Sequence, residues 1–151
     1  MPDALGPRAE RGTTSRGLGR VLVALYATLA LAATARAAVQ LATRFDEAPL
    51  AYLLSAVSAV IYVVATVALV RGGRTGRRTA TVAMTVELLG VLVVGTLSLA
   101  DRAAFPDETV WSGFGRGYGY VPLVLPVLGL LWLWRTRPRP EPPHPAAGGA
   151  V

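Results

Sequence analysis

The chain has no cysteine, no lysine and a single histidine among its 151 residues. The absence of cysteine excludes disulfides, thiolate metal sites and thiol redox chemistry. The histidine, His144, stands in a Pro-rich segment in which neither a metal site nor a proton relay can form around it. No catalytic constellation is present elsewhere, because Ser112 has no histidine to activate it. We therefore predict no enzymatic activity, no metal site and no cofactor.

Charge is also scarce, and this sets the class of the protein. Charged residues make up 16% of the chain and hydrophobic residues 53%, with a mean hydropathy of +0.48. Soluble domains typically contain about 25% charged residues. The apolar residues are gathered in blocks of about twenty, which is the length that crosses a bilayer as a helix. The sequence predicts an integral membrane protein with no separate soluble domain.

Four apolar blocks predict an all-α fold, an antiparallel bundle of four transmembrane helices. Twenty-one helical residues extend about 31 Å at 1.5 Å per residue, enough for a hydrocarbon core of about 30 Å. The blocks are too long for strands, and helix is the spanning form that satisfies its own backbone. Basic and Pro-rich segments before and after the bundle predict disordered tails. The predicted spans are 18–38, 50–70, 79–100 and 119–134, inside a domain 18–134 with tails 1–17 and 135–151.

The first block has a second interpretation. A basic start, a run of apolar or small residues from Val21 to Ala33, and the Ala35-Arg36-Ala37 triplet together resemble a cleaved signal peptide. Cleavage there leaves three spans. The same block carries small-xxx-small spacings, which suit close helix packing. These spacings involve Ala24, Ala27, Thr28, Ala30, Thr34 and Ala37.

Arginines predict the orientation. The net charge of +6 does not indicate nucleic acid, because the arginines flank apolar blocks. Eleven of them fall on one side of the predicted bundle, in the N-terminal segment up to Arg20, the loop between the second and third spans and the C-terminal tail. The other four, Arg36, Arg44, Arg102 and Arg116, fall on the other side. By the positive-inside rule, both termini of this multi-pass protein lie in the cytoplasm and the bundle lies in the cell membrane. The predicted partners are the lipid bilayer and either another membrane protein or a second copy of the chain.

Aromatic residues mark both ends of the last span. Amphipathic rings prefer the level of the lipid headgroups, so these residues are predicted interfacial anchors. Pro126 lies inside the span and is predicted to kink it. The glycines of GFGRGYGY recur at every second residue and do not match a nucleotide-binding loop, so we expect them to let the chain turn at the membrane surface. The predicted anchors are Trp111, Tyr118 and Tyr120 outside and Trp132 and Trp134 inside.

The segment VWSGFGRGYGYVPLVLPVLGLLWLWR, Val110 to Arg135, resembles the end of a group of small, uncharacterised actinobacterial integral membrane proteins. The resemblance covers about the last quarter of the chain in specific residues and the rest only in layout. It implies a four-helix membrane protein with a variable cytoplasmic tail. It brings no catalytic residues with it.

Glu87 is the charged residue that interrupts the third span. It stands nine residues after Arg78, about 13 Å along a helix, and therefore near the middle of the membrane. A charged carboxylate at that depth costs at least about 2.5 kcal/mol, so the group must be protonated, paired or facing a wet cavity. Tyr62 lies nine residues before Arg71, at matching depth, and is the predicted hydrogen-bond partner, with Tyr26 within reach.

Two functions follow from this residue. In the first, Glu87 and Tyr62 hold the helices together in a non-enzymatic structural or accessory membrane protein. In the second, Glu87 couples proton or cation movement in a small transporter, since ionisable groups inside spans often serve that purpose. The sequence slightly favours the first.

Overall fold

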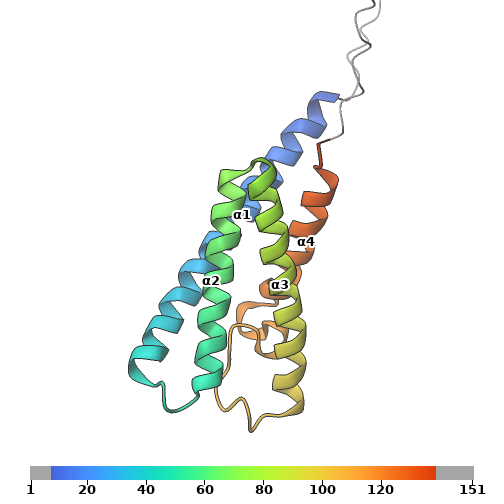
Figure 1. Ribbon diagram of the computed structural model, residues 1–151. Coiled ribbons are helices and arrows are strands. Elements are labelled where there is room, and N and C mark those ends of the chain that lie inside the picture. Colours follow the sequence, from blue (N-terminus) through green and yellow to red (C-terminus); the bar gives the residue numbers. More distant parts are fainter. Residues whose placement is uncertain (1–7, 139–151) are drawn as a thin grey trace, which may run out of the picture.

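The computed structural model describes residues 8–138, with side chains from Arg16 onward, and this part of the chain is helical (Figure 1). Three of its helices are long and apolar enough to cross a membrane, which confirms the all-helical prediction at that level. The elements, in chain order, are α1 (Arg8–Thr43), α2 (Pro49–Arg71), α3 (Gly73–Ala100), the 3-10 turns η1 (Ser112–Phe114) and η2 (Arg116–Tyr118), and α4 (Val121–Arg135).

α1 begins earlier than the sequence predicts. Residues 8–17 were expected in a disordered tail, but α1 is already helical at Arg8 and continues without a break to Thr43. Adding residues to an existing helix costs far less than starting one, so the apolar span extends into the polar residues before it. The rest of the predicted N-terminal tail, residues 1–7, lies outside the described residues, as does most of the predicted C-terminal tail.

α2 and α3 are joined by a very short connection. α2 has almost the predicted bounds, with Pro49 at its start and Arg71 at its end. Gly72 alone separates it from α3, and Gly72 and Gly73 adopt φ of 60° and 67°, which glycine tolerates at little cost. The arginine-rich stretch expected to form a loop before residue 79 therefore lies mostly in the first turns of α3.

The fourth segment is broken. α4 has 15 residues, about 22 Å at 1.5 Å per residue, which is shorter than a hydrocarbon core. The part before it, 101–120, is not a regular helix, and its 3-10 turns meet α4 at an angle of 96°. Figure 1 shows this part rising from the end of α3 alongside the bundle, so that α4 occupies only the upper half of the molecule. Four straight spans are therefore not what the structure contains.

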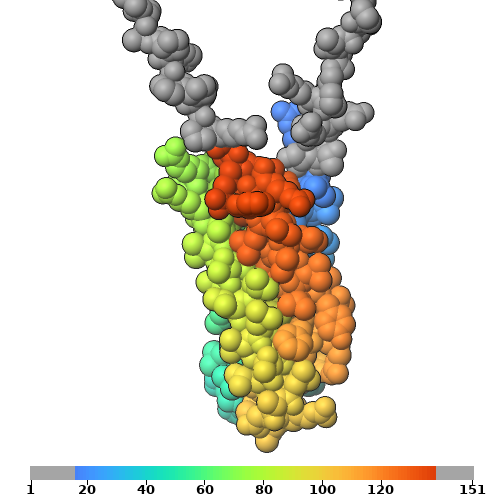
Figure 2. All heavy atoms as spheres, turned by 90° about the vertical axis from the view of Figure 1, so that its right-hand side faces the viewer, coloured from blue at the N-terminus to red at the C-terminus, as the bar shows by residue number. Residues whose placement is uncertain are grey.

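The helices pack in sequence order. α1 lies against α2, α2 against α3, and α3 against α4 and η1. Figure 2 shows the face on which α4, in red, covers the upper part while the chain before it, in orange, lies lower. Small residues, among them Ala33, Ala59, Ala65 and Ala80, line the core and let the helices approach closely. Valines and leucines cover much of the outer surface, as expected for a surface that faces lipid.

Charge divides the bundle into two ends. From Arg16 onward, no acidic residue lies at the end that holds the α2–α3 turn and the last turn of α4. Apart from Glu87, the acids from Arg16 onward lie at the opposite end, on the α1–α2 loop and the segment after α3. The arginines of the first end are Arg16, Arg20, Arg71, Arg74, Arg77, Arg78, Arg135 and Arg137, and the acids of the other end are Asp46, Glu47, Asp101, Asp107 and Glu108.

Candidate functional site

Glu87 lies at the centre of the bundle and is fully buried. It stands near the midpoint of α3, on the face that also carries Met84 and Val91. The hydroxyl of Tyr26, on α1, donates a hydrogen bond to Oε2 of Glu87 at 2.7 Å. Tyr26 is itself fully buried, so this bond joins α1 to α3 without contact with solvent. The site is a carboxyl group held between helices in an apolar core.

The expected hydrogen bond between Tyr62 and Glu87 does not form. Tyr62 is buried beside the site, with its ring centre 6.3 Å from that of Tyr26, but its hydroxyl accepts a hydrogen bond at 3.0 Å from the indole nitrogen of Trp111. Tyr62 was predicted as the partner because it lies at the same depth along α2 as Glu87 does along α3, and its position beside the site agrees with this. The rotation of α2 about its axis, which depth alone does not reveal, directs the hydroxyl to Trp111. Tyr26, the alternative that the sequence offered, is the partner of Glu87.

The second oxygen of Glu87, Oε1, is the unusual atom of the site. It is buried, and among the described residues it has no hydrogen-bond partner. The hydroxyl of Tyr62 is engaged as an acceptor, and no described residue accepts its proton. A buried polar atom without a partner costs about 1–3 kcal/mol, so such atoms are rare in native proteins and often mark functional groups. The cluster Tyr26, Tyr62, Glu87 and Trp111, called the buried polar cluster below, therefore has unused hydrogen-bonding capacity at its centre.

Trp111 reaches this cluster because the chain after α3 turns back into the bundle. Its ring packs on Gly90, where an added Cβ would lie 2.6 Å from Cζ3 of the indole. Gly90 lies ten residues before the end of α3, about 15 Å back along the helix. Phe114 packs in the same way on Gly95, where a Cβ would lie 2.6 Å from its ring. Because these two glycines of α3 have no side chain, segment 101–120 can pack closely against α3 inside the bundle.

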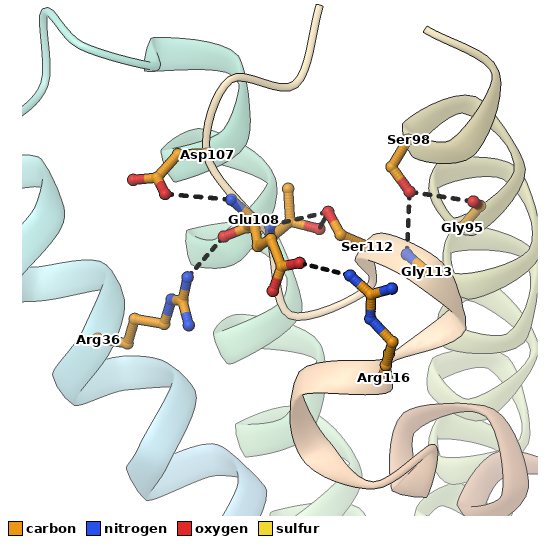
Figure 3. Close-up of polar contacts among 9 residues, drawn as sticks. Arg36, Gly95, Ser98, Asp107, Glu108, Ser112, Gly113 and Arg116 are labelled. Carbon is orange, nitrogen blue, oxygen red and sulfur yellow. Dashed lines mark hydrogen bonds and ion pairs between the residues drawn. The ribbon is translucent and has the colours of Figure 1, made fainter. Parts of the chain in front are cut away.

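Polar bonds near the acidic end hold this segment in place (Figure 3). The guanidinium of Arg36, on α1, donates to the carbonyl oxygen of Glu108 at 2.6 Å, and the hydroxyl of Tyr52, on α2, donates to Asp107 at 2.7 Å. The backbone N–H of Gly113 donates to Ser98, on α3, at 2.9 Å. The segment is thereby bonded to each of the three long helices. Irregular backbone of this kind is tolerated at membrane depth only where protein covers it.

The same segment is strained at particular residues. Gly113, Gly115 and Gly119 have positive φ, as the turn prediction for the glycine-rich stretch requires. Phe114 and Tyr120 also adopt positive φ, of 62° and 61°, which is uncommon for residues with a side chain. This conformation costs of order 1–3 kcal/mol per residue, and at Phe114 the packing of the ring on Gly95 offsets the cost. The chain turns at these glycines as expected, with Gly115 buried and Gly117, Gly119 and Tyr120 exposed. The position of this turn at the membrane surface stays a prediction.

The predicted interfacial anchors have different environments. Trp111 was expected at the outer interface, and this is wrong, because its ring is 3% exposed and lies in the core. Tyr118 and Trp132 are half-buried, and Tyr120 and Trp134 are exposed. For these four, an interfacial position stays a prediction.

The bend in the fourth segment lies between Tyr118 and Val121, ahead of Pro126. Pro126 is buried within α4, and a kink at this residue stays a prediction.

Arg77 fixes the other end of α4. One nitrogen of its guanidinium donates to the hydroxyl of Thr136 at 3.1 Å, and another donates to the carbonyl oxygen of Leu133. The last carbonyls of a helix have no partner within it, and a cation near them also interacts favourably with the helix dipole. Arg77 therefore joins the start of α3 to the end of α4, although the sequence showed it only as part of a basic stretch.

Chemically, the site offers a carboxyl, two phenols and an indole in an apolar surrounding. In the described part of the chain, no three His, Cys, Asp or Glu side chains gather where they could hold a metal ion. Comparisons with family models, curated proteins and solved structures found no match to the chain. The resemblance of Val110 to Arg135 to actinobacterial membrane proteins accordingly stays a prediction.

Proposed function

We propose that the protein crosses the cell membrane four times, with both termini in the cytoplasm. The three long apolar helices support the first three crossings. The fourth consists of α4 together with the re-entrant segment 101–120, which would complete the distance that α4 alone does not cover. Eight of the twelve arginines from Arg16 to Pro138 lie at the end that holds no acid in this range, against four towards the other end, and this supports the orientation, because arginines favour the cytoplasmic side.

Within that membrane, we infer a non-enzymatic structural or accessory role, in which α1 associates with another membrane helix. The observation that carries this proposal is the exposed face of α1. Its middle consists mainly of small residues, with Leu25 and Leu31 as large exceptions, whereas the exposed faces of α2 and α3 carry mainly valine and leucine. Helices in membranes associate through small residues, because these let two backbones approach closely. The exposed small residues in the middle of α1 are Ala24, Ala27, Thr28, Ala32, Thr34, Ala35 and Ala38.

The structure divides the small residues noted in the sequence into two groups. Ala30 and Ala37 are buried and pack inside the molecule. Ala24, Ala27, Thr28 and Thr34 face outward and are available to a second molecule. Since a second copy of the chain is the partner that offers the same surface, we propose self-association through this face.

Disulfide cross-linking tests the proposal, because the chain has no cysteine of its own. We expect Ala27→Cys to form dimers in oxidised membranes several-fold more efficiently than Val60→Cys, a matched exposed position on α2. Adding Ala35→Leu to Ala27→Cys should reduce the yield, because the larger side chain separates the two helices. Equal yields at both positions, or none at Ala27, would refute self-association through α1.

A second function is favoured by one specific observation, the unpartnered Oε1 of Glu87. In transporters, coupling ions bind near the membrane midplane at broken helices, and α4 with its preceding segment is broken in this way. The buried polar cluster would then exchange a proton or bind a cation during transport. The bond from Tyr26 and the complete burial of the cluster support the structural role in the conformation described.

Labelling with an apolar carbodiimide separates the two functions. Strong, pH-dependent modification of Glu87 that is lost in Glu87→Gln would indicate a carboxyl that exchanges protons within the bilayer, and would favour the transporter. No modification, with a normally inserted Glu87→Gln protein, would indicate a sequestered group with a packing role. Asp46 provides an internal reference, since it is exposed on the α1–α2 loop.

A further inference from the structure

A groove with a volume of about 1200 Å³ runs between α3 and α4 at the basic end of the bundle. One side of its mouth is formed by the first turns of α3, and the other by the last turn of α4 and the residues after it. Figure 2 shows these two parts, in green and red, side by side at the top of the molecule. The hydrogen bonds from Arg77 to Thr136 and Leu133 connect the two sides, so the groove has a fixed framework.

The mouth of the groove is strongly basic. Arg74, Arg78 and Arg137 line it and are exposed. Among the described side chains, none of these three arginines has an ion-pair or hydrogen-bond partner, and the single ion pair, Arg116 with Glu108, lies near the opposite end. The three arginines therefore line one opening, and no described side chain bonds to their guanidinium donors. Such donors match the oxygens of a phosphate group in charge and in geometry.

The wall below the arginines is apolar. It is formed by Val82 on α3 and by Leu130, Leu131 and Trp134 on α4. Val82, Leu131 and Trp134 are exposed, and they lie on the side of the arginines that faces the middle of the bundle. A ligand that fills the groove must therefore carry a negative head at the basic end and hydrocarbon further in. A soluble phosphate compound satisfies only the first of these requirements.

We propose that this groove binds an anionic phospholipid of the cytoplasmic leaflet. Its phosphate lies among Arg74, Arg78 and Arg137, and an acyl chain lies along Val82 and Leu131. Each arginine close to an anionic lipid surface adds to the attraction, and here three line one opening. The proposal rests on the membrane residence proposed above, but not on self-association through α1. Lipid binding in the groove and self-association through α1 can therefore fail independently of each other.

Native mass spectrometry of the purified full-length chain in mild detergent provides the test. The probes are phosphatidylglycerol and, as a lipid of the same chain length without net charge, phosphatidylethanolamine. We expect clear retention of the anionic lipid by the wild-type protein. In Arg74→Gln/Arg78→Gln its affinity should fall about tenfold, since two of the three exposed charges that line the mouth are lost.

The matched control is Arg71→Gln/Arg135→Gln. It removes the same charge from two exposed arginines at the same end that do not line the groove. This variant should bind the anionic lipid within about twofold of the wild type. An equal loss in both double variants would show general attraction to the basic end and would overturn the proposal. Circular dichroism and size-exclusion chromatography establish that the variants remain folded.

Two further measurements separate the lipid from a free anion. Inorganic phosphate at millimolar concentration should leave lipid binding unchanged, and displacement of the lipid by phosphate would show that the groove recognises a soluble anion instead. Leu131→Ser should weaken binding of the lipid, because it places a hydroxyl on the apolar wall. Unchanged binding by this variant would contradict the position proposed for the acyl chain.

Discussion

The hydroxyl of Tyr26 and the carboxyl of Glu87 are 61 residues apart in the chain and 2.7 Å apart in the fold. They connect α1 and α3, which are not neighbours in sequence, through a bond that no solvent reaches. The remaining oxygen of Glu87 has no partner among the described residues. The bond from Tyr26 is therefore the one described hydrogen bond that offsets the cost of removing this carboxyl from water.

Replacing Tyr26 should therefore destabilise the fold more than replacing Tyr62. Tyr26→Phe leaves both oxygens of Glu87 without a partner, at a cost of about 1–2 kcal/mol. Tyr62→Phe removes only an acceptor for Trp111, and the cost should be about half as large. Unfolding in SDS titrations, followed by circular dichroism, measures both. Similar losses would mean that the Tyr26 bond contributes nothing specific.

Glu87→Gln should have a small effect on stability, within about 1 kcal/mol of the wild type. The amide keeps nearly the same volume, and its oxygen accepts the same hydrogen bond from Tyr26. The same SDS titrations measure this effect. A larger loss of stability would mean that the carboxyl makes an interaction that an amide cannot replace, and it would complicate the use of this variant as a control for labelling.

Gly90 is one of the two glycines of α3 on which the re-entrant segment packs. In Gly90→Ala the new methyl group lies 2.6 Å from the indole of Trp111, so the ring must move. We expect a loss of about 1–3 kcal/mol and a red shift of tryptophan fluorescence as the ring becomes more exposed. Gly117→Ala is the matched control in the segment itself, because its methyl group meets only Glu108 Oε2, at 3.7 Å. Equal stability of the two variants would contradict close packing at Gly90.

Hydropathy predicted much of the fold but not the course of its fourth segment. The bounds of α2 were correct within one residue, because Pro49 and Gly72 punctuate an uninterrupted apolar run. The re-entrant turn was missed, because the average hydropathy of a segment does not depend on whether its backbone is straight. Trp111 was placed at the interface for a related reason, since tryptophan near the end of a span is typical there.

The candidate site was half predicted. The burial of Glu87 near the middle of α3 agrees with its position in the sequence, and Tyr62 lies near it as expected. The partner itself depends on how far each helix is rotated about its axis, and this is decided by the packing of small residues such as Ala33 and Ala65. Gly90 and Gly95 were the available sign of the re-entrant segment, because glycines on a buried helix face indicate close approach of another part of the chain.

Arg36 provides a test of how the segment is anchored. Its guanidinium donates to the carbonyl of Glu108, and replacing it with methionine removes this donor while keeping an apolar chain of similar length. We expect Arg36→Met to loosen segment 101–120 without unfolding the long helices. Hydrogen exchange should therefore increase in 107–118 and stay unchanged in the middle of α2. Increased exchange throughout the bundle would instead show that Arg36 supports the whole fold.

The orientation can be read directly with single cysteines, since the wild-type chain offers no background. Ala104 is exposed at the acidic end and Thr75 is exposed at the basic end. Because arginines favour the cytoplasmic side, Ala104→Cys should react with a membrane-impermeant maleimide on intact cells. Thr75→Cys should react only after permeabilisation. The reverse pattern would place the termini outside, and the groove between α3 and α4 would then face the outer leaflet.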